Sequence, residues 1–219
     1  MELILIRHGE TAWNAERRLQ GHLDVALNTT GLQQAQALAA ALKSEKLDVI
    51  VCSDLQRAQQ TAAAIAQHQG INCAVQAIWR ERNFGGFEGH LIADLEGLFP
   101  KEYAAWRALE IDNQFPANAQ GEFTGESIRQ FHTRIENALI ALGKNHQNQK
   151  VAVVAHGGVL ECAYRIAQQL PLNATREVAM LNASINRFEL HFENGVMNLK
   201  LIEWGTVAHL NAALDELMP

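Results

Sequence analysis

Ile4-Leu5-Ile6-Arg7-His8-Gly9 joins a short apolar strand directly to an arginine, a histidine and a glycine. Two later segments follow the same plan: Val49-Ile50-Val51 leads towards Arg57, and the apolar residues 151–155 lead into His156-Gly157-Gly158. Ligands of open α/β sheets bind at the carboxyl ends of parallel strands, where the following helices begin. If these three strands lie side by side, one pocket receives two arginines, two histidines and several backbone N–H groups. The sequence therefore predicts an anion-binding pocket at one edge of an α/β sheet.

Strands and helices alternate along most of the chain, which is typical of the α/β class. Periodicity and capping residues predict helices over residues 28–46, 55–69, 126–142 and 159–169. The first of these helices would be capped by Thr29 or Thr30, and the second by Ser53 or Asp54. Apolar runs predict strands over 47–52, 75–79 and 151–155, and residues 185–192 and 196–204 form a hairpin around Asn194-Gly195. A short helix is expected at the C-terminus. This order predicts a three-layer α/β/α sandwich whose sheet is mainly parallel with an antiparallel edge strand.

Residues 84–124 interrupt this alternation. The segment 84–89 is rich in glycine, Tyr103 and Trp106 indicate a short amphipathic helix, and residues 115–124 resemble a loop. Insertions of this kind often select the substrate. Because we find no linker, internal repeat or low-complexity segment, we predict a single domain over residues 1–219 with a lid-like insertion at about 84–124.

Composition excludes several classes of partner. The net charge of the 219 residues is −6 and no run of Lys and Arg occurs, so a nucleic-acid partner is not expected. The apolar segment before Arg7 is too short for a secretory signal or a membrane span. The cysteines Cys52, Cys73 and Cys162 form neither a CxxC motif nor an even framework, which favours a cytoplasmic protein with reduced thiols.

The residues at the three strand ends suit the cleavage of a phosphate monoester. Arg7 and Arg57 offer planar guanidinium groups that match phosphate oxygens. A neutral imidazole is a competent nucleophile near pH 7, and His8 stands where it would attack the phosphorus. His156 would then donate to the phosphoryl oxygens. Each motif alone is weak, but their joint placement favours a shared anion site.

Several ordered motifs resemble the histidine phosphatase superfamily, in the phosphoglycerate mutase-like group. They cover most of the chain in the order of that family: Leu5 to Thr11 with Trp13-Asn14, Gln20-Gly21, Ser53-Asp54-Leu55 with Arg57, Arg80-Glu81, Glu88-Gly89, Gly125-Glu126-Ser127 and His156-Gly157-Gly158. A series of this length is far more specific than any one short pattern. The resemblance implies the phosphoglycerate mutase-like fold.

The resemblance also implies a role for each matching residue. His8 would be phosphorylated, and Glu81 would protonate the leaving oxygen and later activate water. The residues that would hold the phosphate are Arg7, Asn14, Arg57 and His156. The residues that would line the pocket nearby are Gln20, Gly21 and Gly157. No cofactor is implied, and without HExxH, HxH or a carboxylate cluster no metal site is expected.

The same residues are compatible with more than one function. We favour a metal-independent phosphatase of small-molecule phosphate esters over a cofactor-dependent phosphoglycerate mutase, because residues 91–125 carry only Lys101 and Arg107 as cations for a second phosphate. A non-catalytic regulatory module that binds phosphate, and a protein phosphatase, remain as alternatives. The hairpin edge or the C-terminal helix could support a homodimer.

Aromatic residues in the insertion suggest what the pocket accepts. Phe87, Trp106, Phe115 and Phe123 predict a partly apolar pocket mouth. Such a mouth would suit an aromatic or nucleoside-like leaving group. The sequence does not identify one particular ester.

Overall fold

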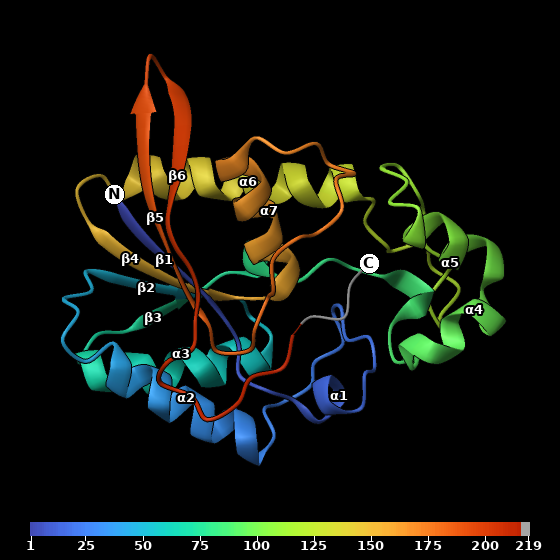
Figure 1. The fold of residues 1–219 in the computed structure, drawn as a ribbon, viewed down its shortest axis with the longest axis horizontal. Coiled ribbons are helices and arrows are strands. Elements are labelled where there is room, and N and C mark those ends of the chain that lie inside the picture. Colours follow the sequence, from blue (N-terminus) through green and yellow to red (C-terminus); the bar gives the residue numbers. More distant parts are fainter. Residues whose placement is uncertain (216–219) are drawn as a thin grey trace.

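The first strand of the chain lies in the middle of the sheet. In the computed structural model, which describes residues 1–215, the strands follow the order β3-β2-β4-β1-β5-β6 (Figure 1). β1 pairs in parallel with β4, which pairs in parallel with β2, and β2 with β3. β5 runs antiparallel to β1, and β6 antiparallel to β5. The strands are β1 (Glu2–Arg7), β2 (Val49–Cys52), β3 (Cys73–Val75), β4 (Lys150–Ala155), β5 (Ile185–Glu193) and β6 (Val196–Thr206). The predicted mainly parallel sheet is confirmed, and the hairpin places its antiparallel strand, β5, one position inside the edge.

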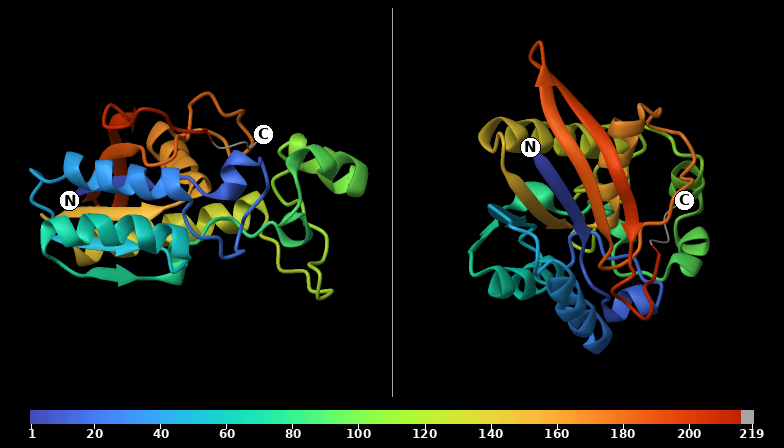
Figure 2. Two further views of the ribbon diagram at one scale, coloured as in Figure 1. Left: turned by 90° about the horizontal axis from the view of Figure 1, so that it is seen from below. Right: turned by 60° about the vertical axis from the view of Figure 1, so that its left-hand side comes forward.

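Helices cover both faces of this sheet, which confirms the three-layer sandwich (Figures 1 and 2). The pair α2 and α3 packs on one face and the pair α6 and α7 on the other. The α-helices are α1 (Ala12–Ala15), α2 (Thr29–Ala41), α3 (Gln56–Gln69), α4 (Leu95–Leu98), α5 (Pro100–Arg107), α6 (Ile128–Asn145) and α7 (Gly157–Gln168), and short 3₁₀ turns are η1 (Ala77–Trp79), η2 (Gly85–Phe87) and η3 (Ile92–Asp94). None of the helices within residues 1–215 is both long and apolar enough to cross a membrane.

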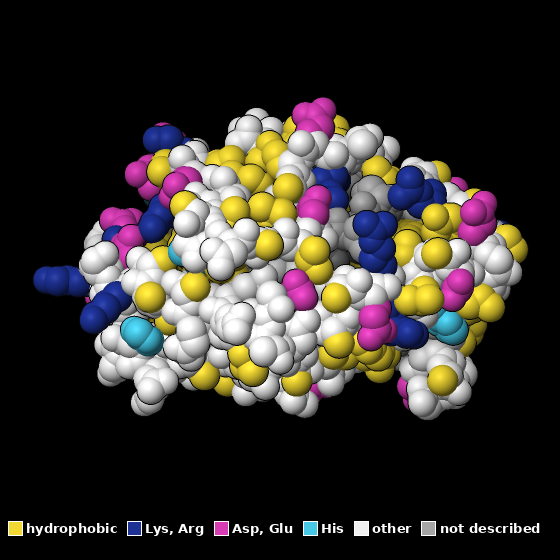
Figure 3. All heavy atoms as spheres, turned by 60° about the horizontal axis from the view of Figure 1, so that its bottom comes forward, with side chains coloured by type: hydrophobic (Ala, Val, Ile, Leu, Met, Phe, Trp, Pro, Cys, Tyr) yellow, Lys and Arg dark blue, Asp and Glu magenta, His cyan; other side chains and the backbone are white. Residues whose placement is uncertain are grey.

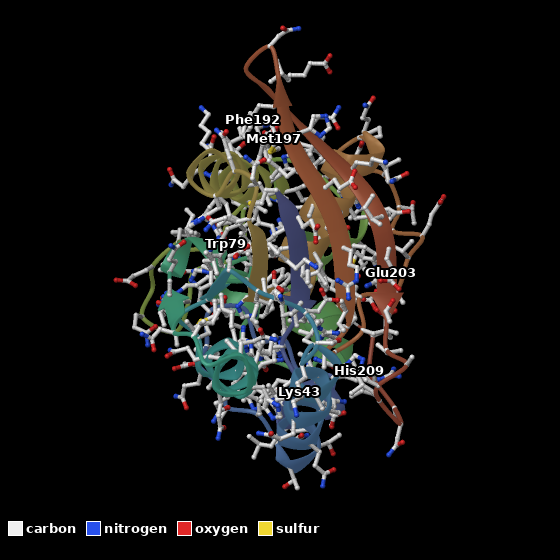
Figure 4. All side chains as sticks on the ribbon, turned by 90° about the vertical axis from the view of Figure 1, so that its left-hand side faces the viewer. Lys43, Trp79, Phe192, Met197, Glu203 and His209 are labelled. Atoms are coloured by element: carbon white, nitrogen blue, oxygen red, sulfur yellow. The ribbon has the colours of Figure 1, made fainter. Side chains whose placement is uncertain are left out.

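The alternation of side chains in β1 divides the core in two. Leu3 and Leu5 pack towards α6 and α7, whereas Ile4 and Ile6 pack towards α2 and α3. This is the period of two that a strand buried on both faces requires. Near the turn of the β5–β6 hairpin, Phe192 and Met197 extend the part of the core that contains Leu3 and Leu5 (Figure 4). β1 is therefore fixed from both sides, which holds its carboxyl end in place.

Several predicted element boundaries are wrong. The strand expected at 75–79 occupies Cys73–Val75, and the next residues form η1, which buries the Trp79 side chain. The first predicted helix is capped by Asn28, whose side chain accepts from Gly31 N. The second lacks a side-chain cap of its own, because Asp24 accepts from Gln56 N instead. Residues 207–215 contain no helix, and the rest of the predicted C-terminal helix lies outside the described residues.

The insertion at 84–124 has a small core of its own. Phe87, Trp106 and Phe115 are buried there, and the Phe87 ring contacts the other two edge to face. Phe123 is instead 77% exposed. The predicted aromatic pocket mouth is therefore wrong for Phe87 and Phe115, because aromatic rings that lie close together in an insertion first exclude water from one another. Trp106 also lines a pocket together with Glu81 and Phe131.

Candidate active site

The hydrogen bonds of His8 fix which ring nitrogen faces outward. His8 follows β1, and its backbone N–H donates to Ala155 O at the end of β4 at 3.0 Å. Its ring Nδ1 lies 2.7 Å from Gly9 O. Because a carbonyl oxygen can only accept, Nδ1 carries the proton in this contact. The Nε2 lone pair of the neutral ring is then available for attack.

A second imidazole stands against the first. His156 follows β4, caps α7 and is fully buried, and its ring centroid lies 5.2 Å from that of His8. Burial lowers the pKa of the His8 ring well below its ordinary value, and the positive charges of Arg57 and Arg7 add to this effect. Burial and Arg57 likewise lower the pKa of His156. Both rings are therefore neutral at pH 7, which is the state that a nucleophile requires.

These lowered pKa values predict how activity responds to acid. A ring whose pKa lies below 6.5 stays neutral to a lower pH than an ordinary histidine. Because kcat/KM reports the free enzyme, its acid limb should have a midpoint below 6.5. The measurement is kcat/KM from about pH 4.5 to 8, corrected for the ionisation of the substrate phosphate. A midpoint at or above 6.5 would contradict the assignment of His8.

Two buried arginines are held beside His8 by backbone carbonyl groups. Arg7 donates through Nη1 to Met180 O and, at 3.0 Å, to Leu214 O. Arg57, in the first turn of α3, donates through Nη2 to Gly21 O at 2.7 Å and through Nη1 to Leu23 O at 2.9 Å. These bonds orient both guanidinium groups before any ligand arrives. A fixed cation loses little entropy when it binds a phosphate oxygen.

The loop after β1 supplies three more of the predicted residues. Thr11 and Asn14 form a reciprocal cap on α1, and Thr11 Oγ1 also donates to Gln20 Oε1 at 3.1 Å. Gly21 has φ of +53°, and a Cβ there would lie 2.0 Å from Glu88 Oε1. Glycine is therefore required at this position both by the backbone and by the space. The loop brings Asn14, Gln20 and Gly21 to one wall of the pocket.

Glu81 is held by two backbone N–H groups. Its Oε1 accepts from Arg82 N at 2.7 Å and its Oε2 from Gly158 N at 3.0 Å. Its own carbonyl accepts from His22 Nε2 at 2.8 Å and from Arg134 Nη2 at 3.0 Å. The Glu81 carboxyl is therefore positioned at the start of α7, close to His156.

Arg134 fastens the segment that carries Glu81. From α6 it donates to the carbonyl oxygens of Ile78 and Arg80, and it forms a bidentate pair with Glu126 at 2.7 Å. The sequence places His22 near the motif segments, where it could reach the pocket rim, but gives no sign of Arg134. Arg134 belongs to no sequence motif, although its ion-pair partner Glu126 belongs to the motif Gly125-Glu126-Ser127.

The pocket in front of His8 has a volume of about 440 Å³, including its open mouth. Six predicted residues line it, namely His8, Asn14, Gln20, Gly21, Arg57 and Glu81. Arg7, His156 and Gly157 do not line it. Seven further residues line it, namely Trp13, Arg17, Arg18, Leu19, Phe84, Ile92 and Asp215. We call this space the catalytic pocket. Several Lys and Arg side chains gather near the insertion on the face shown in Figure 3.

Metal ligands are not clustered in the part of the chain that the structure describes. No group of three or more His, Cys, Asp or Glu side chains there could hold an ion. The groups that surround His8 are instead cations and N–H donors. This donor set suits an anion.

Comparison with known proteins agrees with this geometry. The profile of the histidine phosphatase superfamily (branch 1) matches residues 3–204. The chain is 36% identical to phosphoglycerate mutase-like protein 4 of Arabidopsis thaliana, over 95% of this chain and 86% of that protein. It is 35% identical to a metal-independent phosphoserine phosphatase of the same plant, over 96% and 84% of the two chains. The structure of mycobacterial glucosyl-3-phosphoglycerate phosphatase superposes with a TM-score of 0.78 at 27% identity, covering 94% of this chain and 99% of that one. The resemblance seen in the sequence is confirmed: this chain belongs to the histidine phosphatase superfamily, branch 1.

Proposed function

We propose that this protein hydrolyses small-molecule phosphate monoesters without a metal ion, through a phosphohistidine formed on His8. The observation that carries the proposal is the hydrogen bond from His8 Nδ1 to Gly9 O, which leaves Nε2 as the lone-pair nitrogen in a pocket with Arg57. Relatives named as phosphatases support hydrolysis as the reaction class.

In the first step His8 Nε2 attacks the phosphorus and the bond from phosphorus to the ester oxygen breaks. Glu81, which lines the same pocket, gives its proton to the departing oxygen. The charge that develops on the phosphoryl oxygens is stabilised by Arg7, Arg57 and His156. Neutral His156 can donate one N–H to such an oxygen.

In the second step a water molecule attacks the phosphorus of the phosphohistidine. Glu81, now ionised, takes the proton from this water as the bond from phosphorus to Nε2 breaks. Phosphate leaves, and both His8 and Glu81 return to their starting states. One carboxyl group thus acts as acid and then as base, so the reaction needs no second titratable partner.

Phosphoryl transfer of the mutase type is the second candidate, because several relatives are named as phosphoglycerate mutase-like or as probable phosphoglycerate mutases. A mutase must bind a second phosphate and keep water away from the phosphohistidine. The cations Lys101 and Arg107 of the insertion lie on α5, are exposed and do not line the catalytic pocket. Lys101 and Arg107 therefore provide no second phosphate site there, whereas Arg17 and Arg18 line the pocket and keep the mutase a candidate.

Phosphate release from a panel of monoesters, with EDTA present, tests the proposal. The panel includes 3-phosphoglycerate together with the bisphosphate cofactor of the mutase reaction. For this substrate, isomerisation is measured separately from phosphate release. We expect EDTA-resistant release of inorganic phosphate. Isomerisation without net release would instead establish a mutase, and the absence of turnover on every ester would favour a binding module.

A further inference from the structure

A second pocket meets the catalytic pocket at Glu81. It lies between α5, α6 and α7, has a volume of about 520 Å³ including its mouth, and also contains Glu81 in its lining. Trp106, Leu109, Ile128 and Phe131 give it a largely apolar wall. We call it the side pocket. Because Glu81 faces both spaces, a group protonated by Glu81 could extend from the phosphate into the side pocket.

Arg82 places a positive charge in this apolar wall. The residue is 6% exposed and lines the side pocket. Its Nε donates to Glu126 O at 2.8 Å, and the guanidinium stacks on Phe115 at 4.8 Å and Phe84 at 5.7 Å. Its Nη1 and Nη2 atoms donate to no residue within 1–215, and neither is fully enclosed. Burial lowers the pKa of Arg82 to about 10, so the group stays charged at pH 7.

The carboxylates around Arg82 are engaged elsewhere. Glu126 forms its ion pair with Arg134 at 2.7 Å, and Glu161 with Arg165 at 2.6 Å. Glu81 accepts from two backbone N–H groups. No ion pair of Arg82 occurs in the described part of the chain. A buried cation is costly unless an anion pairs with it, and here the anion is left to a ligand.

We propose that the side pocket receives the leaving group of the substrate and that Arg82 binds a carboxylate on it. This inference rests on the proposed hydrolysis and adds the substrate class: phosphate esters whose alcohol combines an apolar body with one carboxylate. A carboxylate fits better than a second phosphate, because a dianion would lie near Glu81, Glu126 and Glu161. The guanidinium fork suits the planar carboxylate.

A matched pair of esters tests this on the wild-type protein. Phenyl phosphate and 4-carboxyphenyl phosphate differ by the carboxylate alone. We expect kcat/KM to be at least about tenfold higher for the carboxylate ester, mainly through a lower KM. Free benzoate should also compete with phenyl phosphate more strongly than benzamide does.

Variants then assign the preference to Arg82. Arg82→Met should remove the preference for the carboxylate ester, because kcat/KM should fall far more for 4-carboxyphenyl phosphate than for phenyl phosphate. Arg82→Lys should keep part of the preference, because it retains the charge. Arg107→Met, on the exposed face of α5, removes a nearby charge outside the pocket and should preserve the preference.

The outcomes separate this inference from the proposed function. Hydrolysis of phenyl phosphate without any carboxylate preference would overturn the side-pocket assignment and leave the hydrolase intact. An equal loss on both esters in Arg82→Met, with the wild-type preference present, would show that Arg82 serves the fold and overturn its role as the anion ligand. If Arg82→Met does not fold, the carboxylate preference of Arg82→Lys is compared with that of wild type. An unchanged preference in Arg82→Lys would then overturn the role of the Arg82 guanidinium as the anion ligand. Hydrolysis of neither ester by wild type would contradict the proposed function as well.

Discussion

Replacing His8 with alanine is expected to lower kcat by at least about 10⁴-fold, since it removes the imidazole that we propose takes the phosphoryl group. His8 is fixed by its backbone bond to Ala155 O, so the variant should keep its fold. The measurement is phosphate release, together with trapping of an acid-labile phosphoprotein after rapid mixing with labelled ester. Wild type should give the labelled species and His8→Ala should not.

His68→Ala is the matched control for this variant. His68 lies on the exposed side of α3, away from the pocket, and its replacement should leave both turnover and labelling unchanged. Substantial activity in His8→Ala would contradict covalent catalysis. Labelling that persists in His8→Ala would assign the phosphorylated residue elsewhere.

Adding one methyl group at Gly158 is expected to lower kcat by about 10²-fold or more, because it displaces Glu81, which we propose as the acid. A Cβ at this position would lie 2.2 Å from Glu81 Oε1 and 2.9 Å from Phe131 Cε1. Neither contact is tolerable, so the Glu81 carboxyl would have to leave its two N–H donors. Glu81→Gln should cause a loss of similar size, and combining both changes should add little further.

Gly97→Ala provides the control, because a Cβ there meets no atom within 4 Å. It should leave kcat unchanged. Thermal unfolding of Gly158→Ala separates a displaced carboxyl from a general loss of packing at Phe131. An unchanged kcat in folded Gly158→Ala would contradict the assignment of Glu81 as the acid.

The strand ends were predictable from the sequence because their signal is local. An apolar run followed by Arg7-His8-Gly9 or by His156-Gly157 gives both the strand and the residue that follows it. Parallel pairing then brings these ends together, as the register of Arg7 opposite Ala155 demonstrates. Glu81 was predictable only from its family motif, since it follows the 3₁₀ turn η1 instead of a strand.

The supporting contacts were not predictable because they join distant parts of the chain. Asn182 donates to His8 O, and Arg134 reaches the carbonyl groups of residues 78–81. No spacing in the sequence marks either contact. The prediction of an aromatic pocket mouth in the insertion was wrong for another reason. Composition shows that aromatic residues are present but not whether they face each other or a ligand. Here Phe87 and Phe115 face each other.

The central position of β1 has a consequence for how the protein is made. β1 is synthesised well before its two partners, which are β4 (residues 150–155) and β5 (residues 185–193). β2 and β3, with α2 and α3, can associate earlier because their contacts are closer in sequence. The nascent chain therefore carries an unpaired apolar strand and two histidines that are still apart. Closing the sheet buries the strand and brings His8 to His156 in the same late step.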